Sequence, residues 1–232
     1  MRKIGVICGM LAEIETFERA ASGLSLPKAT LDLRISGASS KRAARECETL
    51  FNGGAELIIS YGLAGALDPR HKVGDVVYSG HVVTALDESY GKRPEQTAET
   101  LKLRAGPLST QASVCGVDEI LFEPEDKARL FRMTRAGIAD MESHAAARAA
   151  NHAGKPFIVL RSISDGAEDR LPHFVGKALG EDGKPRILPV LAGLAAHPGT
   201  LPALLRLQKN TKRALETLEA ETRKLLPVIL GG

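Results

Sequence analysis

The chain has 232 residues, of which 44% are hydrophobic and 25% are charged, and its formal net charge is +3. These values are ordinary for a soluble globular domain, and the charge is too small to indicate a nucleic-acid partner. No apolar run approaches the ~20 residues of a membrane-spanning helix, and the run from Ile4 to Cys8 is too short for a signal peptide. We therefore expect a cytoplasmic protein with one domain over residues 1–232.

The cysteines argue against two kinds of site. Cys8, Cys47 and Cys115 are widely spaced and odd in number, and no Cys-x-x-Cys occurs. Zinc and a disulfide framework are therefore not expected. The histidines show no metal-ligand spacing either, so we expect neither a metal nor a cofactor.

Short apolar runs and helical patterns alternate along the first third of the chain. Glycines follow the first strand and the first helix, and a serine-rich stretch precedes the second helix. The pattern predicts strands over 3–8, 31–35 and 57–61, helices over 12–21 and 41–51, and a turn at 73–75 into a further strand.

The rest of the chain continues the alternation after a polar loop over 85–100. Pro124 and the acids after it suit a helix start, and Gly154 suits a helix end. The predicted elements are strands over 108–115, 135–141 and 157–163, a helix from Pro124, a helix over 142–153 and a long helix over 201–226. The fold class is α/β, a mixed sheet flanked by helices, with residues 187–232 as an apolar and helical C-terminal extension.

Two acids stand out in the stretch from 135 to 165. Strand, helix and strand predict a parallel crossover, which places Glu142 and Asp165 at the carboxyl ends of two parallel strands. Open α/β sheets bind their ligands there. A simpler explanation stays open, in which Glu142 is an acid favoured by a helix N-terminus and Asp165 is an ordinary loop acid.

The residues around these acids resemble a known superfamily. Asp140-Met141-Glu142 and Arg161-Ser162-Ile163-Ser164-Asp165 are similar to motifs of the nucleoside phosphorylases and nucleosidases. The resemblance implies a set of roles: Glu142 takes the ribose hydroxyls, Met141 packs on the sugar, Asp165 protonates the purine and Ser164 orients Asp165. Burial of Asp165 would be needed for it to keep a proton at neutral pH.

Two earlier stretches carry the same resemblance. Gly9-Met10-x-x-Glu13 is similar to the nucleosidase opening, where this glutamate orients the attacking water, although an acid at a helix N-terminus needs no such role. Gly62-Leu63-Ala64-Gly65, followed by Val73-Gly74-Asp75-Val76-Val77, resembles a superfamily marker whose glycines let the backbone approach a ligand. Gly62, Leu63 and Ala64 are thus candidate substrate contacts. The relatives usually have serine where Leu63 stands, so their acceptor geometry does not transfer directly.

A phosphate site is a further candidate. Small residues and hydroxyls before a helix N-terminus can hold an anion, and the candidates are Gly9, Ser36, Ser39 and Ser40. A serine-rich helix cap explains the three serines equally well. Ile120 lies where the superfamily places purine contacts and is a candidate for stacking on adenine.

The C-terminal stretch resembles one branch. Leu188-Pro189-Val190-Leu191 and the run from Pro198 to Leu207 are similar to the hopanoid-associated phosphorylases. That resemblance implies adenosylhopane as substrate, phosphate as acceptor, adenine as product, and assembly as a homodimer or larger homo-oligomer. A substrate with a lipid 5′ substituent suggests peripheral contact with the inner membrane surface, through the basic helix after Leu201. Two alternatives stay open: a methylthioadenosine/adenosylhomocysteine nucleosidase that uses water, and a non-catalytic nucleoside-binding protein.

Overall fold

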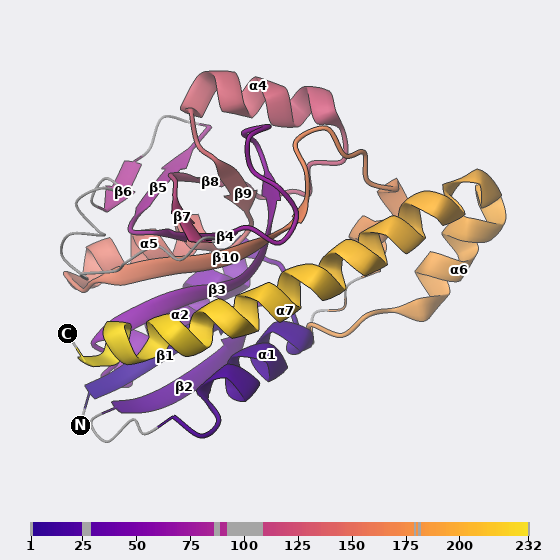
Figure 1. The fold of residues 1–232 in the computed structure, drawn as a ribbon. Helices are drawn as coiled ribbons and strands as arrows, with labels where there is room; N and C mark the ends of the chain where they lie inside the picture. The colour runs from indigo at the N-terminus through magenta and orange to yellow at the C-terminus, as the bar shows by residue number, and fades with distance from the viewer. Residues whose placement is uncertain are drawn as a thin grey trace.

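The computed structural model describes residues 2–24, 29–85, 89–91, 109–178, 180 and 182–231. These residues form one ten-stranded sheet with helices on both faces (Figure 1). The strands are β1 (Arg2–Cys8), β2 (Ala29–Ile35), β3 (Leu57–Ala66), β4 (Val76–Ser79), β5 (His81–Thr84), β6 (Ser89–Gly91), β7 (Ser109–Gln111), β8 (Val114–Gly116), β9 (Ile138–Asp140) and β10 (Phe157–Asp165). The helices are α1 (Leu11–Ala21), α2 (Ser40–Asn52), α4 (Pro124–Thr134), α5 (Ser143–Ala153), α6 (Ile187–Ala196) and α7 (Leu201–Gly231), with short 3₁₀ turns at His173–Lys177 and Pro198–Thr200. The expected α/β class is confirmed.

The centre of the sheet is the pair β3 and β10. β3 pairs in parallel with β1 on one side and with β10 on the other. Nearly every residue of both strands is buried, as expected for strands covered by helices on both faces. The order β6-β5-β8-β9-β3-β10-β4-β7 places the ends of β3, β9 and β10 side by side.

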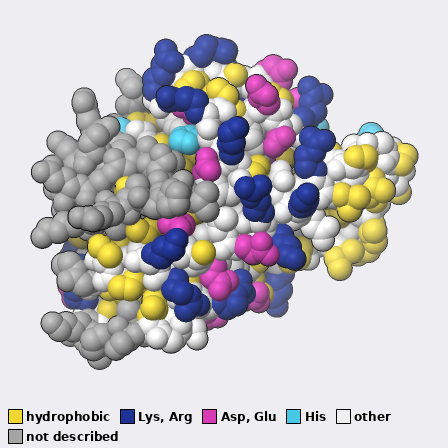
Figure 2. Space-filling view, viewed as in Figure 1, with side chains coloured by type: hydrophobic (Ala, Val, Ile, Leu, Met, Phe, Trp, Pro, Cys, Tyr) yellow, Lys and Arg dark blue, Asp and Glu magenta, His cyan; other side chains and the backbone are white. Residues whose placement is uncertain are grey.

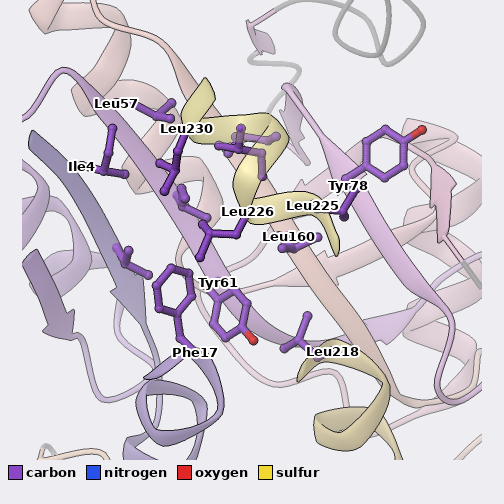
Figure 3. Packing of buried hydrophobic residues seen from close by; sticks show 14 of the residues in the cluster. Ile4, Phe17, Leu57, Tyr61, Tyr78, Leu160, Leu218, Leu225, Leu226 and Leu230 are labelled. Carbon is purple, nitrogen blue, oxygen red and sulfur yellow. The ribbon is translucent and has the colours of Figure 1, made fainter. Parts of the chain in front are cut away.

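One helix layer holds the largest core cluster. The long helix α7 lies across the sheet beside α1 (Figure 1). Its residues Leu218, Leu225 and Leu226 pack against the strands, and Phe17 of α1 meets Tyr61 of β3 edge to face at 4.9 Å (Figure 3). Helices α2 and α5 cover the opposite face around Ile7 and Ile58.

Several expectations about elements were wrong in part. The strand expected over 57–61 continues to Ala66, and β6 lies within the expected loop 85–100, most of which is outside the described residues. β9 and β10 do not form a parallel crossover: β10 runs parallel to β3, whereas β9 runs antiparallel to it and parallel to β8. The prediction failed because β9 and β10 flank β3 in opposite directions, so Glu142 and Asp165 do not follow two parallel strands. The expected strand 108–115 is divided at Ala112 into β7 and β8, which pair with different neighbours. The last helix continues past Leu226 to Gly231.

The C-terminal extension projects from the body of the molecule. Figure 1 shows α6 and the first turns of α7 as a hairpin at the right. The expected leucine stripe is core only in part: Leu218 and Leu225 are buried, whereas Leu201 and Leu205 are exposed. In the described part of the chain no single helix has the length and hydropathy of a membrane span; α6 and the helix after it, bent by 115°, meet those criteria only as a pair.

Candidate active site

A cavity of about 260 Å³ opens where β3, β9 and β10 end. The first turn of α1, the start of α4 and the loop after β10 complete its wall. Its lining includes Gly9, Met10, Glu13, Leu63, Ala64, Ile120, Lys127, Asp140, Met141, Glu142, Arg161, Ser164, Asp165, Leu171 and Val175. Thus residues that lie far apart in the sequence meet in one place.

One part of the wall is a buried cluster of acids around a single arginine. Arg161 of β10 is 1% exposed, and its guanidinium contacts Asp140 at 2.9 Å and Glu142 at 3.0 Å. It also donates hydrogen bonds to Ser60 and to the carbonyl oxygen of Leu63. A buried cation needs this degree of pairing, because desolvation of an unpaired charge is costly. Arg161 therefore fixes the position of Glu142.

Glu13 is held in the same region by the main chain. Its Oε2 accepts hydrogen bonds from the N–H groups of Gly9 and Met10, at 2.7 and 2.9 Å, and its Oε1 accepts one from Leu63 at 2.8 Å. Gly62 has a φ of 147°, and a Cβ there would overlap the Glu13 carboxylate. Glycine is thus needed at position 62 both for its backbone angle and for the space.

The protonation of these two acids is shifted toward the neutral form. Burial, opposed by Arg161 and supported by the nearby Asp140 and Glu13, raises the pKa of Glu142 to about 7. Burial also raises the pKa of Glu13, again opposed by Arg161. Desolvation disfavours the charged form of a carboxyl group, and like charges nearby add to the effect. Glu142 is thus suited to exchange a proton near neutral pH, and Glu13 is a stronger base than an exposed glutamate.

Asp165 lies on another part of the wall. The hydroxyl of Ser164 donates to its Oδ1 at 2.9 Å, and the ammonium of Lys127 donates to its Oδ2 at 2.5 Å. Asp165 is 7% exposed and Lys127 is 1% exposed. Burial of Asp165 was expected, but its direct pairing with a lysine was not.

The predicted substrate contacts are mostly in the cavity wall. Ile120, Met141, Ser164, Leu63 and Ala64 line it. Gly62 does not line it, but its lack of a side chain leaves room for the Glu13 carboxylate. Leu63 donates its main-chain N–H to Glu13, a contact that does not depend on the side chain at this position.

The predicted phosphate residues already have hydrogen-bond partners within the protein. The N–H of Gly9 is bonded to Glu13, and the hydroxyl of Ser36 donates to the carbonyl oxygen of Cys8 and to Glu142. Ser39 caps α2 by accepting from the N–H of Arg42, as the simpler explanation predicted, and Ser40 donates to Asp118 at 2.5 Å. None of the three serines lines the cavity.

The contacts of Arg161 and Lys127 were not predicted from the sequence. Each had a signal: Arg161 interrupts an otherwise apolar buried strand, and Lys127 is a cation in the first turn of a helix, where the helix dipole disfavours it. The partners of both residues come from distant parts of the chain, so the contacts themselves are visible only in the fold. Within the described ranges, no cluster of three or more His, Cys, Asp or Glu suits a metal ion.

Comparison with known proteins places this cavity in context. Residues 33–184 match the model of the phosphorylase superfamily. A 5′-methylthioadenosine/S-adenosylhomocysteine nucleosidase of Tolumonas auensis is 30% identical over 138 residues, which cover 50% of this chain and 60% of that protein. The protein of the same name in Shewanella halifaxensis is 28% identical over 157 residues, which cover 59% of this chain and 68% of that protein.

A solved structure extends the likeness to nearly the full chain. The Helicobacter pylori 5′-methylthioadenosine/S-adenosylhomocysteine nucleosidase, solved with butyl-thio-DADMe-Immucillin-A, superimposes with a TM-score of 0.68. The alignment covers 97% of this chain and 98% of that one, at 15% identity. At this identity the likeness concerns the fold alone, whereas the sequence matches to the two bacterial proteins span only about three fifths to two thirds of their length.

Proposed function

Because the chain belongs to the phosphorylase superfamily, we propose that it cleaves the N-glycosidic bond of a 5′-substituted adenosine, with water as acceptor and adenine as leaving group. One observation carries the proposal: Glu13 and Glu142 share a single cavity with Asp165. The relatives compared above are named nucleosidases, which supports the same class of reaction.

The chemistry requires acids of two kinds. Breaking the bond builds positive charge on the ribose and negative charge on the base, as in other glycosidic cleavages. Glu142, fixed by Arg161, accepts hydrogen bonds from the ribose hydroxyls, and these strengthen as the sugar becomes cationic. Asp165, held by Ser164, faces the purine and passes it a proton, a contribution of typically ~10²–10⁴-fold in rate.

Water suits this cavity better than phosphate. The N–H groups of Gly9, Met10 and Leu63 are bonded to Glu13, and Arg161 is paired with Asp140 and Glu142. An incoming phosphate would therefore meet carboxylates in place of the donors that anion sites use. The raised pKa of Glu13 instead makes this side chain a base able to take a proton from water.

A base-specific assay tests the proposed class. The purified protein is incubated with 5′-methylthioadenosine, S-adenosylhomocysteine, adenosine and uridine, and the released bases are separated by chromatography. We expect adenine from the 5′-substituted adenosines and no uracil from uridine. Tight binding of the adenosines without release of adenine would support a nucleoside-binding protein instead.

A second candidate differs in the 5′ substituent, which would be the triterpene of adenosylhopane in hopanoid biosynthesis. The observation that favours it is the apolar hairpin, residues 187–205, which includes all of α6. Ile187, Leu188 and Leu191 are 69%, 79% and 56% exposed, and Figure 2 shows hydrophobic side chains gathered at this end of the molecule. Residues 183–215 carry six lysines and arginines and no acid. An apolar surface with basic residues beside it suits an anionic bilayer.

The hairpin also borders a hollow beside the catalytic cavity. This hollow of about 550 Å³ lies between the turn at His173–Lys177 and α6, and Leu171 lines both cavities. The catalytic cavity itself reaches the helix of the hairpin farther along, because Leu207 and Thr211 of α7 line it. The position of α7 at the cavity and the exposed apolar hairpin favour a long apolar substituent, carried by a protein that meets its substrate at the inner membrane surface.

Paired substrates distinguish the two candidates. We expect Leu191→Ser to reduce turnover of adenosylhopane while turnover of 5′-methylthioadenosine is retained, and to weaken co-sedimentation with anionic vesicles. Met133→Ser on α4 is the matched control, because Met133 is also an exposed apolar residue, at 61%. Equal loss on both substrates, or equal effects of both variants, would argue against a lipid substituent.

A further inference from the structure

Lys127 is a buried cation in direct contact with Asp165. It stands in the first turn of α4 and is 1% exposed. Its ammonium group donates three hydrogen bonds: to Oδ2 of Asp165 at 2.5 Å, to the carbonyl oxygen of Gly166 at 2.9 Å and to that of Asp169 at 3.1 Å. All three N–H bonds of the ammonium thus have partners, and each partner belongs to the end of β10 or to the loop after it.

This placement works against general preferences for a lysine. Lysine is seldom fully buried, and a cation near a helix N-terminus is opposed by the helix dipole. The pair with Asp165 offsets both costs, because each charge compensates the other. An ion pair that only stabilised the fold would not have to lie in the wall of the substrate cavity, yet both residues line that cavity.

We propose that Lys127 is a positioning residue for the departing purine: it aims the carboxyl group of Asp165 and supplies, through Asp165, the proton that the purine receives. The proposal rests on the proposed adenosine cleavage and deepens it. Ser164 holds one oxygen of Asp165 and Lys127 holds the other, so the carboxyl plane is fixed from two sides.

The proton reaches the purine from Lys127 in two transfers, through Asp165. As the bond between C1′ and the purine nitrogen breaks, its electron pair goes to the base. A proton moves from the Lys127 ammonium to the Asp165 carboxylate and from there to the purine, which leaves as neutral adenine. Water adds its oxygen to C1′ and gives its proton to Glu13. Lys127 is left as a neutral amine and regains a proton from solvent after adenine departs, while Glu13 releases its own.

A change of leaving group tests this role. The Lys127→Met variant keeps the length of the side chain but loses the charge and the donors, whereas Lys127→Arg keeps both. Lys155→Met is the control, because Lys155 is exposed. The substrates are 5′-methylthioadenosine, whose base needs a proton to leave, and 4-nitrophenyl riboside, whose phenolate leaves without one.

We expect Lys127→Met to release adenine at least ~10²-fold more slowly, the scale of a lost proton donor, and to release nitrophenolate at the wild-type rate. Lys127→Arg should recover part of the adenine release. Equal losses on the two substrates, or no loss on either, would overturn the proposal, since a general packing role does not depend on the leaving group. If the wild-type protein releases no adenine from any adenosine, the proposed function and this role both fail; activity with unchanged rates in Lys127→Met removes the role of Lys127 alone.

Discussion

In the proposed mechanism Asp165 is the side chain that protonates the leaving purine. We expect Asp165→Asn to bind 5′-methylthioadenosine much as the wild type does and to turn it over at least ~10²-fold more slowly, because the amide cannot pass on a proton. Steady-state kinetics and equilibrium binding separate the two effects. Glu168→Gln, an exposed acid three residues away, is the control and should behave as the wild type. Near-normal turnover in Asp165→Asn would remove this residue from the mechanism.

Glu142 gives the activity a defined pH dependence. Its pKa is raised to about 7, and the ionised form is the better acceptor for the ribose hydroxyls. We therefore expect kcat/KM to rise as the pH increases through about 7, and Glu142→Gln to lose this limb together with most of the turnover. A raised KM with unchanged kcat in the variant would mean that Glu142 only binds substrate.

The raised pKa of Glu142 also makes the stability of the fold depend on pH. The folded state holds the Glu142 proton more tightly than the unfolded chain, whose ordinary value is 4.5. The favourable contribution of this group is therefore complete below pH 4.5 and is lost as the pH rises to about 7. Relative to Glu142→Gln, the wild-type free energy of unfolding should fall by up to about 3 kcal/mol across that window. Parallel stability curves for the two proteins would contradict the shift.

At the scale of elements, Gly62 within β3 leaves the space that the Glu13 carboxylate of α1 occupies. Gly62→Ala would strain a backbone with a φ of 147° and would push the new methyl group into the Glu13 carboxylate. We expect a loss of stability of about 1–3 kcal/mol, the usual cost of such a strained position, together with a large loss of turnover. Thermal unfolding and adenine release measure the two effects.

Gly199→Ala is the matched control for that substitution. Gly199 has nothing within 4 Å of its added methyl group and a backbone angle that other residues adopt. This variant should therefore unfold at the wild-type temperature or slightly above it. Equal behaviour of the two alanine variants would show that close packing at position 62 is not required.

The elements also show what the sequence was able to predict. Periodicity and glycine positions predicted α1, α2, α5 and β10 within a few residues, because these signals are local. The direction of β9 was not predicted, since it depends on the pairing of β9 with β8 and with the last two residues of β3. The division between β7 and β8 was missed for the same reason: each part pairs with a different strand.

The candidate site, like the fold, was predicted only in part from the sequence. Glu13, Met141, Glu142, Ser164 and Asp165 were predicted, because their motifs resemble a superfamily, and all of them line one cavity. The ion pairs of Arg161 and Lys127 were not predicted, because their partners lie as far as 38 residues away in sequence. Burial adds the pKa shifts, which no motif contains.

At the scale of the whole molecule, assembly remains a prediction. The resemblance to the superfamily implies a homodimer or larger homo-oligomer, and light scattering after size exclusion measures the mass directly against the 24.7 kDa of one chain. We expect at least twice that mass, unchanged by Leu191→Ser if α6 faces a bilayer instead of a second copy. A shift to the monomer mass in Leu191→Ser would assign the hairpin to the subunit interface.

The role proposed for Glu13 depends on whether water or phosphate accepts the sugar. The decisive measurement follows adenine release from 5′-methylthioadenosine with and without phosphate, and uses phosphorus NMR to look for a sugar 1-phosphate. The occupied N–H groups around Glu13 predict the same rate in both buffers and a free sugar as the product. Release that requires phosphate and yields the sugar 1-phosphate would contradict the role given to Glu13 and would make the protein a phosphorylase.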